Sequence, residues 1–276
     1  MRRITLNTFG PWAIITGASS GIGEEFARQL AASGLHLVLV ARRLQALNTL
    51  GSELARTCGI SYRAIELDLT ADDALEKLSD ATRDLNIGLV ISNAGAMIPG
   101  DFLSLDYQAL RRDLRLNVQA HLDLAYHFGS HLAQRGRGGL LLVASTTGFQ
   151  GIPFAAEYAA AKAYVLSLGE ALHVEFQRMG VHVTVLSPGA TDTPLIAASG
   201  FDASTMPMKP MATRQCVSEG LAALAANRAV HIPGYFNRML TALLPRSLAT
   251  SMYGSMMRQV TAGRSVLSKG ILQETQ

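Results

Sequence analysis

The segment WAIITGASSGIGEEFARQLAASG, residues 12–34, joins a strand, a glycine turn and a helix without a break. Residues 12–16 form the continuous apolar run of a buried strand, and residues 24–34 follow helical spacing and end at a glycine. Gly17, Gly21 and Gly23 let the backbone turn tightly and approach an anion, toward which the first amides of the helix point. The spacing G-x-x-x-G-x-G differs from the dinucleotide fingerprint G-x-G-x-x-G, so a plain strand-to-helix turn is the alternative.

The same alternation of strands and helices continues along the chain. Apolar runs predict further strands at residues 35–41, 61–67, 87–92, 140–144, 181–186 and 230–232. Helical periods lie at residues 44–58, 71–85, 102–133, 157–179 and 217–226. This order predicts an α/β, Rossmann-like doubly wound fold, with a mostly parallel seven-stranded sheet and helices on both faces. No linker or repeat interrupts it, so we expect one domain, residues 1–276, with a substrate lid at 194–215 and a C-terminal helical extension at 235–276.

Composition limits the class of protein. The 276 residues are 49% hydrophobic, which suffices for a large core, and the net charge is only +3 with scattered basic residues, which disfavours nucleic acid as a partner. Cys58 and Cys216 are the only cysteines, too few for a disulfide framework or a zinc site and suited to a reducing compartment. The first apolar run is typical of a strand rather than a signal peptide, and no stretch reads as a spanning helix. We therefore expect a cytoplasmic protein.

The end of the second predicted strand carries two arginines. In dinucleotide-binding units, an acidic residue about 20 residues past the glycines accepts a hydrogen bond from the 2′-hydroxyl of the adenosine ribose. Ala41 and Arg42 occupy that place here, and a guanidinium suits a 2′-phosphate because it forms charge-assisted bonds to it. This favours NADP(H) over NAD(H), unless Arg42 and Arg43 simply begin a surface helix.

Two further strand ends carry polar or small residues. Asp68, before Leu69, either accepts a hydrogen bond from an adenine amino group or caps the following helix, and both roles stay open. Asn93, Ala94 and Gly95 follow the fourth strand, and small residues there allow a flat ligand to lie against the backbone.

The segment LLLVASTTGFQGIPFAAEYAAAK, residues 140–162, brings a hydroxyl, a phenol and an ammonium into one part of the chain. Ser145 ends a strand, while Tyr158 and Lys162 are four residues apart and share one face of a helix. Together they indicate a proton-handling site. Asn117 has apolar neighbours within a helical region, and we expect it to be a buried polar group.

The same helical region contains His121, His127 and His131. The last two are four residues apart, a spacing that suits a metal ion, but no glutamate completes an H-E-x-x-H pattern. We predict surface or interface imidazoles and no metal site.

Several segments together resemble one family, the short-chain dehydrogenases/reductases in their single-domain form. TGASSGIG at residues 16–23 resembles the cofactor loop of the family, and residues 93–95 resemble its N-A-G element, with Ser92 where another Asn is usual. Pro188-Gly189 followed by Thr193 resembles the loop on the nicotinamide side. Four residues match the catalytic positions in order and spacing: Asn117, Ser145, Tyr158 and Lys162.

The resemblance, which covers roughly residues 10–233, implies hydride transfer between NADP(H) and a carbonyl or hydroxyl group. Ser145 would stabilise the developing oxyanion, Tyr158 would give the proton, and Lys162 would favour the phenolate and hold the nicotinamide ribose. Asn117 would anchor a water between Lys162 and solvent. A homodimer or homotetramer is the habit of the family. The implied cofactor contacts are Gly17, Ser19, Ser20, Gly21, Ile22, Gly23, Arg42, Asp68, Leu69, Asn93, Ala94, Gly95, Tyr158, Lys162, Pro188, Gly189, Thr191 and Thr193.

The substrate is the least determined property. The groups expected to face it carry no fixed charge, which favours a lipophilic ketone or aldehyde, 3-oxoacyl or steroid-like. They are Met97, Ile98, Phe149, Ile152, Phe154 and the methionine-rich lid. An NADPH-binding sensor or scaffold protein without turnover is the alternative of a different class. We expect the Met- and Arg-rich segment from Tyr235 onward to pack on its own core or on a partner subunit, rather than to lie at a membrane surface.

Overall fold

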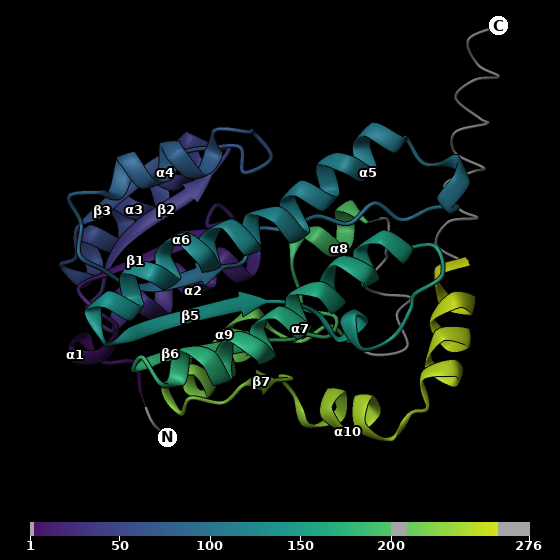
Figure 1. The fold of residues 1–276 in the computed structure, drawn as a ribbon. Coiled ribbons are helices and arrows are strands. Elements are labelled where there is room, and N and C mark those ends of the chain that lie inside the picture. The colour runs from purple at the N-terminus through teal and green to yellow at the C-terminus, as the bar shows by residue number, and fades with distance from the viewer. Residues whose placement is uncertain (1–2, 200–208, 259–276) are drawn as a thin grey trace, which may run out of the picture.

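The computed structural model describes residues 3–199 and 209–258, and a seven-stranded sheet forms its centre. The strands stand in the order β3-β2-β1-β4-β5-β6-β7, and neighbouring strands run parallel (Figure 1). The predicted doubly wound α/β fold is confirmed, and the strand order reverses between β1 and β4. The strands are β1 Trp12–Thr16, β2 His36–Ala41, β3 Tyr62–Glu66, β4 Ile87–Ser92, β5 Gly138–Val143, β6 Val181–Leu186 and β7 Val230–His231.

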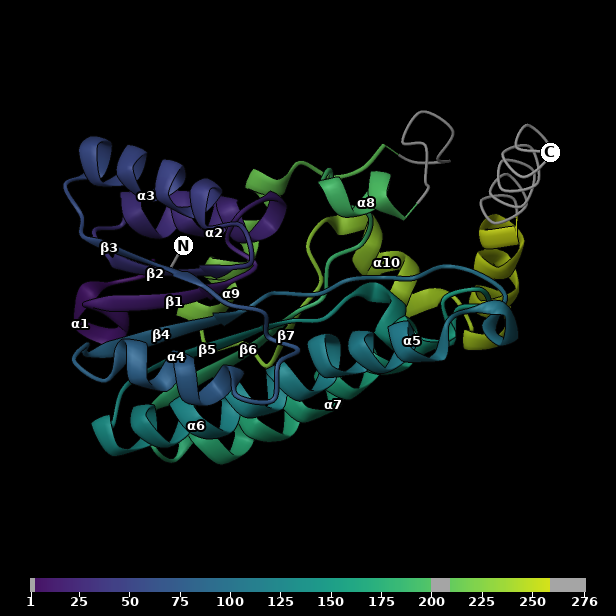
Figure 2. The same cartoon turned by 90° about the horizontal axis from the view of Figure 1, so that it is seen from above.

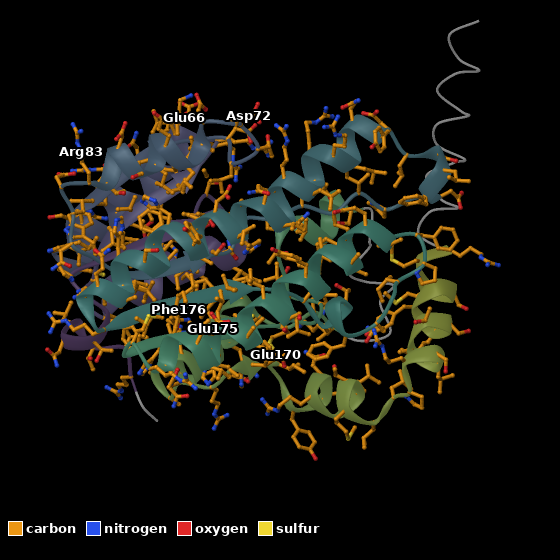
Figure 3. The ribbon with its side chains drawn as sticks, in the orientation of Figure 1. Glu66, Asp72, Arg83, Glu170, Glu175 and Phe176 are labelled. Carbon is orange, nitrogen blue, oxygen red and sulfur yellow. The ribbon has the colours of Figure 1, made fainter. Side chains whose placement is uncertain are left out.

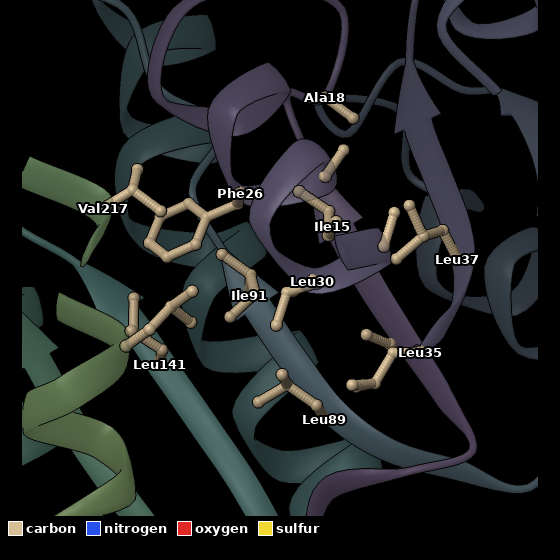
Figure 4. Packing of buried hydrophobic residues seen from close by; sticks show 14 of the residues in the cluster. Ile15, Ala18, Phe26, Leu30, Leu35, Leu37, Leu89, Ile91, Leu141 and Val217 are labelled. Atoms are coloured by element: carbon tan, nitrogen blue, oxygen red, sulfur yellow. The ribbon is translucent and has the colours of Figure 1, made fainter. Parts of the chain in front are cut away.

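Helices cover both faces of the sheet (Figure 2). One face carries α2 Gly21–Ala32, α3 Leu44–Cys58 and α9 Thr213–Ala225. The other carries α4 Ala74–Thr82, α6 Ala120–Arg135 and α7 Ala156–Gln177. Strands β4 and β5 are buried along their whole length, which explains why their sequences are unbroken apolar runs rather than alternating ones. Figure 4 shows the first core, where Phe26 and Leu30 of α2 pack over Ile15 and Ile91.

The predicted elements need two corrections. A one-turn helix that was not predicted, α1 Leu6–Phe9, precedes β1, and its Phe9 is buried against Gly139 of β5. The region 102–133, expected as one long helix, is instead divided into four pieces. These are the 3-10 turn η1 Phe102–Ser104, helix α5 Tyr107–Leu114, the π-helical segment η2 Arg115–Gln119, and α6.

Shorter segments lie beyond the carboxyl ends of the strands. They are η3 Thr146–Phe149 after β5, α8 Pro194–Ala198 after β6, and α10 Tyr235–Leu243 after β7. The chain then continues through residues 245–258, where Ala249 and Met257 are buried. Part of the expected lid, residues 200–208, lies outside the described residues. Within residues 3–199 and 209–258, no helix has the length and apolar character needed to cross a membrane.

Candidate active site

A cleft of about 1650 Å³ opens at the carboxyl ends of the strands, where the strand order reverses. The glycine loop and the end of β2 line one part of it, and apolar side chains line another. Ser145 and Tyr158 lie on its wall. Of the catalytic and cofactor-binding residues expected from the sequence, only Gly23 and Asn117 do not border the cleft, and both are buried.

Close backbone contacts shape the glycine loop. Gly17 adopts a φ of +67°, and a Cβ atom there would lie 2.9 Å from Asn93 Nδ2. Gly23 packs against the carbonyl oxygen of Gly17, so a side chain at Gly23 would push the start of α2 away from the loop. The Thr16 hydroxyl ties the loop to β4, because it accepts hydrogen bonds from Asn93 N at 2.9 Å and Ala94 N at 3.1 Å. The first amides of α2 thus face a tight concave turn, which fits a phosphate group.

Both arginines at the end of β2 border the cleft and are exposed. Arg43 Nη2 donates to the carbonyl oxygen of Ser19 at 3.1 Å and to Ser19 Oγ at 3.0 Å, so its guanidinium is held against the glycine loop. The sequence pointed to Arg42 alone. Arg43 is therefore a candidate phosphate contact that the sequence reasoning missed, although its position next to Arg42 was a sufficient signal.

Asp68 does not cap the following helix. Its Oδ1 accepts hydrogen bonds from Thr70 N at 2.9 Å and Thr70 Oγ1 at 2.8 Å, which closes a turn, while α4 begins at Ala74 with Asp73 in the cap position. The backbone hydrogen bond from Thr70 is the main cause that lowers the pKa of Asp68, and the nearby charge of Arg42 adds to it. Of the two roles left open, the cap is therefore wrong, and contact with a ligand in the cleft that Asp68 borders stays a prediction.

Ser145 and Tyr158 come together at the end of β5. The Ser145 hydroxyl lies close enough to the Tyr158 phenol to affect its ionisation, and Ser145 Oγ accepts from Thr147 N at 3.1 Å and donates to the carbonyl oxygen of Pro188 at 3.4 Å. Because Ser145 is fixed by the turn of η3 and by the loop after β6, its hydroxyl has a defined position beside the phenol. Once the Ser145 O–H turns away from the Pro188 carbonyl, the two hydroxyl groups can both donate to one acceptor oxygen.

Lys162 and Asn117 lie behind this pair. Lys162 is 3% exposed, its Nζ donates to the carbonyl oxygen of Val143 at 3.1 Å, and Nζ lies 5.6 Å from the centre of the Tyr158 ring. Asn117, in the π-helical segment, pairs with the backbone of Ala96 through Nδ2 to O at 2.9 Å and N to Oδ1 at 3.3 Å. A Cβ atom on Gly95 would lie 2.8 Å from Asn117 Oδ1 and 3.2 Å from Lys162 Nζ, so both side chains meet at this glycine.

Burial is the main cause of the pKa shifts of Tyr158 and Lys162. It raises the pKa of Tyr158 to about 12, which the neighbouring Ser145 hydroxyl opposes and the charges of Asp113 and Glu157 reinforce. Burial also lowers the pKa of Lys162 to about 8, and the same two carboxyl groups oppose that shift. Neither carboxyl group was singled out from the sequence.

The loop after β6 closes the cleft opposite the glycine loop. The Pro188 carbonyl oxygen accepts from Thr146 N at 2.8 Å, and Thr191 Oγ1 donates to the carbonyl oxygen of Gly189 at 3.0 Å. Thr193 packs against Gly21, where a Cβ atom would lie 3.2 Å from the Thr193 side chain. The two loops expected to hold a cofactor are therefore adjacent, although they are far apart in the sequence.

The apolar part of the cleft differs from the expected set. Met97, Ile98 and Ile152 border the cleft, as expected. The predictions for Phe149 and Phe154 are wrong, because Phe149 packs against the core of the sheet and Phe154 borders a separate, smaller cavity. The wall that the sequence missed comes from the C-terminal segment, whose period of apolar residues was the available signal: Phe236, Leu240, Met252, Tyr253, Met256 and Met257.

The three histidines of α6 have separate surroundings. His121 is 1% exposed and its Nδ1 lies 2.7 Å from Ser92 Oγ, so the expectation of a surface or interface imidazole is wrong for this residue. His127 and His131 stack edge to face, with ring centres 4.7 Å apart. In the described part of the chain, no three metal-ligating side chains gather in one place.

Comparison with known proteins assigns the chain to a class. The chain matches the model of the short chain dehydrogenases over residues 11–202. It is 35% identical over 186 residues to 7beta-hydroxysteroid dehydrogenase of Clostridium sardiniense, a match that covers 67% of this chain and 71% of that protein. The chain therefore belongs to the short-chain dehydrogenase family, and it is an oxidoreductase that acts on hydroxyl or carbonyl groups.

Two solved structures show how far the likeness extends. A short-chain dehydrogenase from Sphingobium yanoikuyae, in complex with NADPH, gives a TM-score of 0.78 at 30% identity and covers 86% of this chain and 97% of its own. The bulky-bulky ketone specific alcohol dehydrogenase from Comamonas testosteroni gives a TM-score of 0.74 at 32% identity and covers 85% of this chain and 92% of its own.

Proposed function

We propose that this protein is an NADP(H)-dependent reductase of a lipophilic ketone or aldehyde, with Ser145, Tyr158, Lys162 and Asn117 as its catalytic residues. The observation that carries the proposal is the position of the Ser145 hydroxyl beside the Tyr158 phenol on the wall of a cleft whose neighbouring surface is apolar. A carbonyl oxygen between the two hydroxyl groups receives two hydrogen bonds, which is what a developing oxyanion requires.

The side chains of the chain have distinct tasks in this reaction. When bound, the reduced nicotinamide supplies the hydride to the carbonyl carbon. Ser145 donates a hydrogen bond to the carbonyl oxygen as negative charge grows on it, and Tyr158 gives that oxygen its phenolic proton. The ammonium of Lys162 stabilises the resulting phenolate, and because Lys162 is almost completely buried, its charge acts with little screening by water. Asn117 pairs with the backbone of Ala96 and so fixes the neighbouring Gly95, which lies against Lys162.

The cofactor proposal rests on the shape and charge of the cleft. The tight glycine loop at the start of α2 fits a pyrophosphate, and the exposed guanidinium groups of Arg42 and Arg43 fit a 2′-phosphate. Lys162 would hold the nicotinamide ribose, and the Pro188-Gly189 loop would cover the nicotinamide. The NADPH complex of the Sphingobium yanoikuyae relative supports NADP(H) over NAD(H).

The substrate proposal rests on the apolar wall. Met97, Ile98 and Ile152, with the C-terminal residues Leu240 and Met257, offer a wide surface to a rigid or long hydrocarbon. The names of the two relatives, a hydroxysteroid dehydrogenase and a dehydrogenase of bulky ketones, support a steroid-like ketone, with a 3-oxoacyl chain as the other member of the proposed class.

A kinetic screen tests the proposal. Oxidation of NADPH should be measured with a 7-oxosteroid, a diaryl ketone, a long-chain 3-oxoacyl thioester and cyclohexanone, and the bulky compounds should turn over fastest. Tyr158→Phe should abolish turnover and keep NADPH binding, because only the proton donor is lost. Tyr164→Phe is the matched control, since Tyr164 lies on the same helix at 38% exposure. Absence of turnover with every carbonyl would favour a sensor or scaffold that binds NADPH.

The organisation of the chain is part of the proposal. Residues 194–215 would act as a substrate lid and residues 235–276 as a helical extension of a single domain, although residues 200–208 and 259–276 of these segments lie outside the described residues. Exposed apolar side chains on α5, α6 and α7, such as Tyr107, Tyr126 and Val174, support a homodimer or homotetramer. The two cysteines are free, which suits the reducing cytoplasm. Light scattering of the purified protein and fractionation of its source cells test these points.

A further inference from the structure

Two carboxyl groups that this mechanism does not use meet behind the catalytic residues. Asp113 lies in the last turn of α5 and is 5% exposed, while Glu157 lies in the first turn of α7, directly before Tyr158. Their side chains are within hydrogen-bonding reach of each other, and Asp113 also borders the cleft. The contact joins two helices, so no local pattern in the sequence reveals it.

The two carboxyl groups lack other donors. Asp113 Oδ2 and Glu157 Oε1 are buried and receive no hydrogen bond from any group among the residues that the structure describes. Two ionised carboxylates in contact repel each other, and burial strengthens that repulsion. A single proton between them removes the repulsion and supplies the missing hydrogen bond. Consistent with this, burial and the charge of Asp113 raise the pKa of Glu157 to about 7, and burial raises the pKa of Asp113.

The carboxyl pair acts on the reacting groups. Both members raise the pKa of Lys162 against the effect of burial, and both oppose ionisation of Tyr158. From α6, His121 lies close enough to Lys162 for their charges to interact. Among the described residues, Lys162 and Tyr158 are the titratable groups that interact with the carboxyl pair, and His121 interacts with Lys162. Because burial and the charge of Asp113 raise the pKa of Glu157, the pair can hold a proton near neutral pH and give it to the neighbouring amine.

We propose that Asp113 and Glu157 share one proton and restore the proton that Tyr158 and Lys162 give up in each reduction. The inference rests on the proposed carbonyl reduction. For each carbonyl reduced, the Tyr158 phenol loses one proton to the new alcohol, the phenolate takes one from the Lys162 ammonium, and the amine regains one from the pair. The pair then takes one proton from bulk solvent through the cleft that Asp113 borders, so the reduction consumes one solvent proton for each carbonyl. Both carboxyl groups are positioning residues, because they act through Lys162 and not on the substrate.

Carbon-13 NMR of protein labelled at the glutamate carboxyl carbons tests the shared proton without any substrate. One resonance should titrate with a midpoint near pH 7. It should be missing in Glu157→Gln, and its midpoint should fall by at least about one pH unit in Asp113→Asn, which removes the repelling charge. Glu170→Gln is the control, since Glu170 is an exposed carboxylate on the same helix (Figure 3) and should leave that resonance unchanged. A Glu157 midpoint below about pH 5.5 overturns the proposal.

The pH profile of kcat for reduction of a 7-oxosteroid tests the proton supply. In Glu157→Gln, the fall of kcat with rising pH should begin about one unit lower, with kcat reduced roughly tenfold near pH 8 and KM changed less than about threefold. Glu170→Gln should superimpose on the wild type, and retained NADPH binding shows that each variant is folded. Coincident profiles for Glu157→Gln and wild type overturn the proton-restoring role. If wild type reduces no ketone, that role falls with the proposed function, while the NMR titration still decides whether the pair shares a proton.

Discussion

We expect the wild-type protein to lose stability in mild acid because of His121. Replacement of His121 by asparagine should remove that loss. The His121 ring is 1% exposed and bonds to Ser92 through Nδ1 at 2.7 Å, and Nε2 has no partner among the described residues. Burial lowers the pKa of its imidazole well below the ordinary 6.5, and the nearby charge of Lys162 lowers it further. In the folded protein this ring therefore stays neutral in mild acid.

The size of the effect follows from proton linkage. Below pH 6.5 the imidazole takes up a proton in the unfolded chain but not in the folded protein. Because the unfolded state then binds more protons, the free energy of unfolding falls as the pH falls. The loss is about 1.4 kcal/mol for each pH unit, so it reaches about 2 kcal/mol near pH 5 and vanishes above about pH 7.5.

Urea unfolding at about pH 5 and about pH 7.5 measures this loss. Asparagine keeps an acceptor near the position of Nδ1 for the Ser92 hydroxyl, and any cost of its smaller size is the same at both pH values. The stability difference between the two pH values should be about 2 kcal/mol smaller in His121→Asn than in wild type. Gln134→Ala, at an exposed position of the same helix, should keep the wild-type difference. If the stability of wild type and His121→Asn depends equally on pH, the argument is refuted. That result would mean that the His121 imidazole takes up its proton in the folded state as well.

Two further predictions concern the ends of the cleft. Arg42→Ala and Arg43→Ala should each weaken NADPH binding about tenfold or more and leave NADH binding nearly unchanged, as a charge-assisted contact to a phosphate implies, while Arg56→Ala on α3 should change neither. Equal losses for both nucleotides in titration calorimetry would contradict a 2′-phosphate contact. Leu240→Ala should raise KM for a 7-oxosteroid about fivefold but not for cyclohexanone, because it removes apolar contact area at the far wall. Leu243→Ala, 74% exposed and outside the cleft, should leave both values unchanged.

The cofactor half of the site was predictable because it depends on local chain geometry. The turn at Gly17 and Gly23 is made within one strand-to-helix connection, and parallel strands bring their carboxyl ends to one edge of the sheet. Arg42 and Asn93 therefore fall beside the glycine loop once the strands are recognised. Continuous apolar runs in the buried strands made that recognition secure.

The substrate half was not predictable in the same way. Phe149 and Phe154 are equally apolar, and only tertiary packing decides that neither ring borders the cleft. Tyr253 and Met257 border it because the C-terminal segment folds back over the loop after β5, a contact between distant parts of the chain. The Asp113–Glu157 contact has the same origin, since it requires α5 to pack against the start of α7.

The π-helical segment explains why three polar side chains can face Lys162 from one region of the chain. Asp113, Asn117 and His121 are spaced by four residues, and each four-residue step along an α-helix rotates the side chain by about 40°, so an unbroken α-helix would turn His121 about 80° from Asp113. In η2 the amide of Ala120 bonds to the carbonyl of Arg115, so this turn takes up one more residue than an α turn and cancels part of that rotation. All three side chains are accordingly buried, at 5%, 0% and 1% exposure, and Lys162 interacts with the first and the last. The break in the helix therefore aligns the polar groups behind the phenol, which an ideal helix of the same sequence would not do.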